Sequence, residues 1–85
     1  MAPIALTLYS RPGCHLCEAM KEIVYPLARE LNCVLAEVDI SGDPALEARY
    51  GTEIPVLLVN DRKAFKYRLT ERELRRRLRA EENRR

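Results

Sequence analysis

Short apolar runs alternate along the chain with longer segments whose apolar residues recur every three or four positions. Residues 4–9 (IALTLY) are mostly apolar and lead into a Pro-Gly turn, which predicts a buried strand. Residues 14–31 carry apolar side chains at helical spacing and predict a helix with one buried face. Pro26 lies inside this segment and lacks a backbone N–H, so we expect a kink or a break near Tyr25.

The next segments predict a second strand and a second helix. Residues 33–40 are rich in branched side chains and are typical of a strand. Asp43 can cap the start of a helix, with Pro44 at its first position. Gly51 is a natural stop for that helix.

The last third of the chain predicts a hairpin followed by a third helix. Residues 56–59 (VLLV) indicate a buried strand, 60–62 a turn and 63–67 an alternating edge strand. Thr70 and Glu73 have the spacing of a capping box at a helix start. The predicted order is therefore β-α-β-α-β-β-α, an α/β fold with a four-stranded mixed sheet flanked by three helices.

Length and composition fit one small globular domain. The chain has 85 residues, of which 47% are hydrophobic and 33% charged, which argues against disorder. We expect residues 1–85 to form a single domain and 82–85 to be a frayed tail. No apolar run is long enough to cross a bilayer and no secretory signal is apparent, so we expect a cytoplasmic protein without membrane association.

Three cysteines carry the candidate chemistry. Their odd number excludes a fully paired disulfide framework, and in a reducing compartment a close pair is more often catalytic or metal-binding than structural. Cys14 and Cys17 lie three residues apart in a predicted first helical turn, where Cβ atoms are about 5–6 Å apart. Small adjustments would close a disulfide between them. We interpret Cys33 as a small buried side chain at the start of a strand.

The position of each thiol indicates its role. Cys14 would lie at the helix entrance, where free backbone N–H groups and the helix dipole stabilise a thiolate and lower its pKa below about 8.5. Arg11 adds positive charge nearby. Cys17 lies one turn deeper and should stay protonated longer. We therefore expect Cys14 to attack a disulfide and Cys17 to resolve the mixed disulfide, with exposed His15 adding positive potential when protonated.

A second candidate element is Ile54-Pro55, just before the third predicted strand. Proline is tolerated where a strand opens because no ladder donor is needed there. If the bond between these residues is cis, the backbone of Ile54 turns toward the thiols and can pair with an extended thiol substrate. A simple strand-opening turn is the alternative interpretation.

Two other interpretations of the cysteine pair stay open. Cys14 and Cys17 could be structural, or they could form half of a zinc site. Zinc sites need about four ligands, and only Cys33 and His15 remain to complete one. We expect no bound metal or prosthetic group.

The cysteine segment and the later Ile-Pro together resemble a known family. The string LYSRPGCHLC at residues 8–17, with Pro55 about forty residues on, a hairpin and a final helix, is similar to glutaredoxins of the thioredoxin superfamily. It especially resembles small bacterial glutaredoxin-like proteins of unassigned role, over roughly residues 4–80. The resemblance implies a thioredoxin-like fold, a cis bond before Pro55, Cys14 as nucleophile and Cys17 as resolving thiol.

Several positions depart from the family pattern. Leu8 stands where thioredoxins have a buried acid that assists proton transfer. Residues 68–71 (RLTE) replace the Gly-Gly pair and following acid that hold glutathione in glutaredoxins. Arg11 matches the basic residue that contacts a glutathione carboxylate, and Ile54-Pro55 matches the family's Val-Pro, so half of a glutathione site is present.

The basic end of the chain supports a rival function. Residues 62–85 hold eleven basic and four acidic residues, whereas 1–61 hold four basic and nine acidic. This surface could make the chain a thioredoxin-fold binding module for an acidic protein or a nucleic acid. We favour a solvated helix face, because the arginines surround a Leu74/Leu78 seam that must pack and few aromatic residues lie nearby.

The sequence therefore predicts a thiol–disulfide oxidoreductase. Its catalytic residues would be Cys14 and Cys17, and its substrate-binding residues Arg11, His15 and Ile54-Pro55. The substrate would be a disulfide-containing protein or a small thiol, and the electron source glutathione or a reductase protein. We expect a monomer that does not bind nucleic acid.

Overall fold

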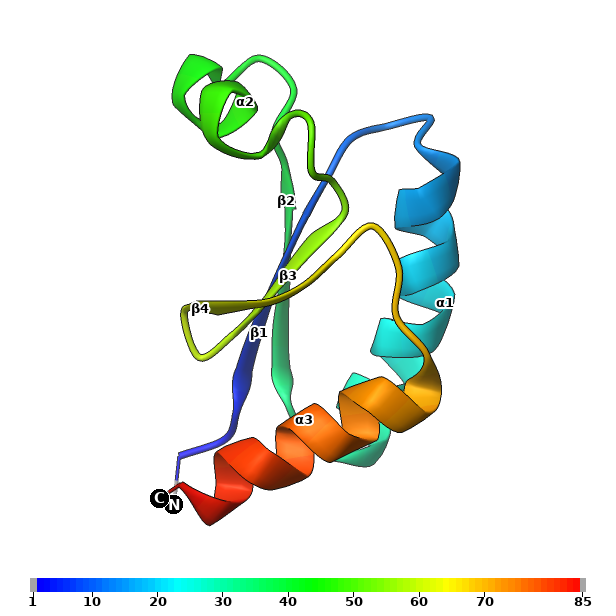
Figure 1. The fold of residues 1–85 in the computed structure, drawn as a ribbon, viewed down its shortest axis with the longest axis vertical. Helices are drawn as coiled ribbons and strands as arrows, with labels where there is room; N and C mark the ends of the chain where they lie inside the picture. Colours follow the sequence, from blue (N-terminus) through cyan, green and yellow to red (C-terminus); the bar gives the residue numbers. More distant parts are fainter. Residues whose placement is uncertain (1, 85) are drawn as a thin grey trace.

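The computed structural model describes residues 2–84 and has the predicted element order (Figure 1). Its elements are β1 (Ala5–Ser10), α1 (His15–Glu30), β2 (Val34–Asp39), α2 (Pro44–Tyr50), β3 (Val56–Val59), β4 (Arg62–Lys66) and α3 (Glu71–Asn83). Each predicted strand or helix is present, with ends shifted by one or two residues. Among residues 2–84, no helix combines the length and apolar content that a bilayer-spanning segment requires.

The four strands form one mixed sheet in the order β2-β1-β3-β4. β1 runs parallel to β2 and antiparallel to β3, and β4 lies antiparallel to β3 at the edge. The turn between β3 and β4 consists of Asn60 and Asp61, both with positive φ, which suits the twist of a two-residue hairpin. The sheet therefore has the connectivity of a thioredoxin-like fold.

Helices cover both faces of the sheet. The larger core lies between the sheet and the helices α1 and α3, and it contains Leu6, Leu8, Val24, Leu57 and Leu74 among others. A smaller cluster on the other face is built by Ile40, Tyr50 and Val56. The two clusters follow from the alternation of side chains along β1 and β3.

Of the kink or break expected near Tyr25, the break is wrong, because helix α1 is continuous across Pro26. Proline removes the hydrogen bond to the carbonyl of Glu22, but both residues are exposed and water can reach that carbonyl. On the opposite side, Val24 and Leu27 are buried in the core and hold the helix against the sheet.

The predicted helix starts of α2 and α3 are confirmed. Asp43 caps α2 by accepting from the backbone N–H groups of its first turn. At α3, the backbone N–H of Glu73 donates to Thr70 Oγ1 at 3.1 Å, and the backbone N–H of Thr70 donates to Glu73 Oε1 at 2.8 Å. This is a complete capping box. Helix α3 then extends to Asn83, two residues into the segment expected to fray, and Arg85 lies outside the described residues.

One buried carboxylate ties α3 to the sheet. Glu81 is 5% exposed and accepts hydrogen bonds from Asn60 Nδ2 at 2.9 Å and Arg77 Nη1 at 2.8 Å, with Arg62 at 3.3 Å. Asn60 Oδ1 in turn accepts from the backbone N–H of Ala5. The Asn60 side chain in the hairpin turn therefore connects α3 with the start of β1. The bond from Asn60, with that from Arg77, lowers the pKa of Glu81 to about 2.

We predict that Glu81→Gln lowers stability at neutral pH and reduces the sensitivity of the fold to acid. Because the pKa of Glu81 is lowered on folding, its contribution is fully present above the ordinary pKa of 4.5 and is lost as pH falls toward about 2. Urea unfolding at about pH 7 and about pH 3.5 measures this, and the difference between wild type and variant should shrink at the lower pH. Glu82→Gln, at an exposed neighbouring position, is the matched control. An equal difference at both pH values would contradict the prediction.

Candidate active site

The two cysteines of the motif meet at the entrance of α1. Cys14 is the N-cap residue, with extended backbone angles, and its Sγ accepts a hydrogen bond from the backbone N–H of Cys17 at 3.1 Å. The two side chains are joined as a disulfide, and their Cα atoms are 5.2 Å apart. The predicted place of Cys14 at the helix entrance and the predicted proximity of the pair are both observed.

The two sulfurs differ in their access to solvent. Cys17 has no exposed surface and faces the interior of the fold, whereas Cys14 is partly exposed at the mouth of the helix. Gly13 precedes Cys14 with a φ of +76°, a left-handed conformation that glycine adopts without strain and that turns the chain from β1 into the helix. A partner molecule can therefore approach Cys14 but not Cys17.

A polar cleft of about 430 Å³ opens beside Cys14 and is lined by His15, Lys21 and Glu37 among others. Lys21 Nζ lies 2.8 Å from Glu18 Oε2 and also pairs with Glu37. The hydrogen bonds from Lys21 and then from Tyr25 lower the pKa of Glu37, which keeps this carboxylate charged. The roles of Lys21, Tyr25 and Glu37 were not predicted, although Lys21 and Tyr25 follow Cys17 at four-residue intervals on one helix face.

An apolar hollow of about 190 Å³ lies against a different side of α1. Leu16, between the two cysteines, lines it together with Tyr67, and these side chains are 36% and 42% exposed. The backbone N–H of Tyr67 donates to the carbonyl of Pro55 at 2.9 Å, and its hydroxyl donates to the carbonyl of Thr52 at 3.1 Å. Tyr67 therefore connects the Ile54-Pro55 loop with the wall of this hollow, and the Ile54–Pro55 bond is cis, as the resemblance implied.

The remaining predicted site residues lie in different surroundings. His15 is exposed and lines the polar cleft with Cys14. Arg11 pairs with Glu47 of α2, so its guanidinium is directed toward that helix. Ile54 is half-buried and packs against the smaller core cluster.

The geometry gives no support to a metal site. Residues 2–84 contain no group of three or more histidine, cysteine, aspartate or glutamate side chains placed to hold a metal ion. Cys33 lies outside the disulfide, is half-buried and packs against the larger core cluster. Cys33 was predicted as a small buried side chain at the start of a strand; it is instead half-buried and directly precedes β2.

Comparison with known proteins gives the family. A family model described as glutaredoxin-like domain (DUF836) matches residues 5–79. The chain belongs to this glutaredoxin-like family. It is also 30% identical over 77 residues to the glutaredoxin-like protein YDR286C homolog of Dictyostelium discoideum, a match that covers 84% of this chain and 71% of that protein.

Solved structures show the same fold. Protein XcR50 from X. campestris is 36% identical, with a TM-score of 0.74 over 88% of this chain and 96% of that one. Protein Ne2328 from Nitrosomonas europaea is 29% identical, with a TM-score of 0.75 over 91% and 93% of the two chains. A thioredoxin from Halobacterium salinarum is 20% identical, with a TM-score of 0.69 over 91% and 73%, which shows the shared fold. The glutaredoxin-like chain thus has the fold of thioredoxins.

Proposed function

We propose that this glutaredoxin-like protein catalyses thiol–disulfide exchange. The observation that carries the proposal is the placement of its cysteine pair, with one partly exposed sulfur at a helix entrance bonded to a buried sulfur one turn deeper. In this arrangement the Cys14 thiol can contact the substrate, and the Cys17 thiol remains available to resolve the mixed disulfide.

The exchange takes two steps in which atoms and electrons balance. The Cys14 thiolate attacks one sulfur of a substrate disulfide, forms a mixed disulfide and releases the first substrate thiolate, which takes up a proton. Cys17 then loses its proton and attacks the Cys14 sulfur, which releases the second substrate thiol. The substrate disulfide is reduced to two thiols, and the two protein thiols are oxidised to the disulfide seen in the structure.

The helix entrance supplies the stabilisation that the thiolate needs. We expect Cys14 to keep its N-cap position in the reduced protein, at a helix entrance where backbone N–H groups are free and the dipole is positive. The N–H of Cys17 already donates to Cys14 Sγ. Cys17 is fully buried, and burial disfavours the charged form of a thiol.

The substrate-binding residues of this proposal are His15 and Ile54, with Pro55 buried beside Ile54. The main chain of Ile54 would pair with an extended substrate by strand addition. The electron source would be glutathione or a reductase protein, with the protein acting as a cytoplasmic monomer. Arg11 would have to leave Glu47 to meet a glutathione carboxylate, which argues for a weak glutathione site or for a protein reductant.

Alkylation of the reduced protein tests the difference between the two thiols. We predict that Cys14 reacts with iodoacetamide with a pKa clearly below about 8.5, and that Cys17 reacts only at higher pH. Mass spectrometry of peptides labelled across a pH series separates the two sites. Equal, unshifted reactivities would contradict the assignment of roles.

Single substitutions test the two-step scheme by trapping. Cys17→Ser should accumulate a stable mixed disulfide on Cys14 with a model disulfide, because no resolving thiol remains. Cys14→Ser should form no such adduct, since the remaining thiol at the site is buried. Cys33→Ala, outside the pair, is the control and should behave as wild type. Trapping on Cys17 in the Cys14→Ser variant would show that the order of attack is wrong.

A further inference from the structure

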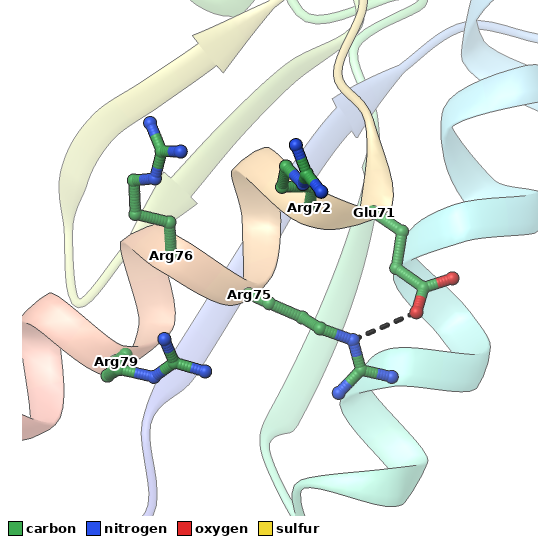
Figure 2. Close-up of a pocket in the computed structure, with 5 residues that line it drawn as sticks. All are labelled: Glu71, Arg72, Arg75, Arg76 and Arg79. Atoms are coloured by element: carbon green, nitrogen blue, oxygen red, sulfur yellow. Dashed lines mark hydrogen bonds and ion pairs between the residues drawn. The ribbon is translucent and has the colours of Figure 1, made fainter.

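A basic groove of about 540 Å³ runs along α3, away from the polar cleft. It is lined by Arg72, Arg75, Arg76, Arg79 and Glu71. The arginines lie at positions i, i+3, i+4 and i+7, which keeps them on one side of the helix. Figure 2 shows them extending from successive turns of α3.

Most of the positive charge of this groove is not neutralised. Arg75 donates to Glu71 and to both carboxylate oxygens of Glu30, at 2.8–2.9 Å. Arg72, Arg76 and Arg79 are exposed, and no carboxylate of residues 2–84 lies within ion-pairing distance of them. Three guanidinium groups are therefore available to an external partner.

The groove follows the apolar hollow along the chain. The apolar hollow is walled by Leu16, next to Cys17, and by residues 67–69, which lead directly into α3. Arg68 lines that hollow, is exposed and lies four residues before Arg72. The surface therefore changes from apolar beside the disulfide to cationic along α3.

We propose that this combined surface docks an acidic protein whose disulfide is the substrate of Cys14. An apolar side chain of that protein would enter the hollow at Leu16 and Tyr67, and a carboxylate cluster would meet Arg72 and Arg76. The proposal rests on the function proposed above and adds the class of partner. Planar guanidinium groups match carboxylates in geometry as well as charge.

The structure favours protein carboxylates over a nucleic acid. No aromatic side chain lines the groove to stack on a base. Residues 1–61 hold nine acidic against four basic residues, so the positive surface does not extend over the molecule as a long polyanion requires. A compact acidic patch fits this short basic face.

A pair of synthetic peptides tests the charge preference. Each contains one cysteine, oxidised as a mixed disulfide with 5-thio-2-nitrobenzoate, followed by a leucine, a Gly-Ser spacer and four residues that are all Glu or all Gln. A spacer of about six residues reaches roughly 20 Å, more than half of the longest dimension of the molecule, 35 Å. The release of nitrothiobenzoate by the reduced protein in a single turnover gives the rate constant for each peptide.

The Glu peptide should react faster than the Gln peptide at low salt, and the advantage should fall as salt rises. Arg72→Gln combined with Arg76→Gln should reduce the rate with the Glu peptide by about two- to thirty-fold, the range that two exposed ion pairs cover. The rate with the Gln peptide should not change. Arg29→Gln combined with Arg49→Gln makes the same change in net charge outside the groove and should leave the advantage intact.

Binding measurements separate docking from chemistry. A labelled Glu peptide with serine in place of cysteine should bind the wild type in fluorescence anisotropy and bind the groove variant more weakly. Equal rates for the two peptides together with no binding would overturn the docking proposal and leave the redox function standing. Binding without any nitrothiobenzoate release would support docking and contradict the redox function. Binding of a labelled single-stranded RNA through the same arginines, with no preference for the Glu peptide, would assign the groove to nucleic acid instead.

Discussion

The hydrogen bond from the backbone N–H of Cys17 to the sulfur of Cys14 is the interaction on which the site depends. It makes one side chain serve both as the cap of α1 and as the exposed member of the disulfide. The same donor can face a thiolate after reduction, so the cap that starts the helix also stabilises the reactive form. The remaining fold holds this entrance in place, because Met20 and Val24 fix α1 against the sheet while Cys14 stays at the surface.

Charge is distributed unevenly around this entrance. Lys21 and Glu37 pair in the polar cleft beside Cys14, and Arg11 pairs with Glu47 at α2, so these charges largely compensate one another. The arginines that have no carboxylate partner among residues 2–84 lie along α3 instead. They are Arg72, Arg76 and Arg79. A substrate that approaches through the apolar hollow therefore meets an apolar and then a cationic surface.

Features encoded by neighbours in the chain were predictable from the sequence. The Asp43 cap and the Thr70–Glu73 capping box depend on residues three or fewer positions apart, and both are present. The element order followed from apolar spacing, and the cis bond before Pro55 from the family resemblance. The break at Pro26 was wrong because tertiary packing of Val24 and Leu27 outweighs one lost hydrogen bond.

Contacts between distant residues were not predictable in this way. Arg11 and Glu47 are 36 residues apart, and Asn60 and Glu81 are 21 apart, so only the folded chain brings them together. The sequence placed Arg11 near Cys14 correctly along the chain but could not give the direction of its side chain. The burial of Glu81 could not be predicted either, because its position on an arginine-rich helix is typical of a solvated residue.

The most direct test of the central claim is the catalysed reduction of hydroxyethyl disulfide. It is measured in two parallel assays, one coupled to glutathione and one coupled to thioredoxin reductase. This substrate is small and uncharged, so its turnover depends on the dithiol and not on docking at α3. The account predicts turnover above the uncatalysed rate in at least one of the two systems, and its loss in Cys14→Ser. Turnover at the uncatalysed rate in both systems, or full activity without the Cys14 thiol, would contradict it.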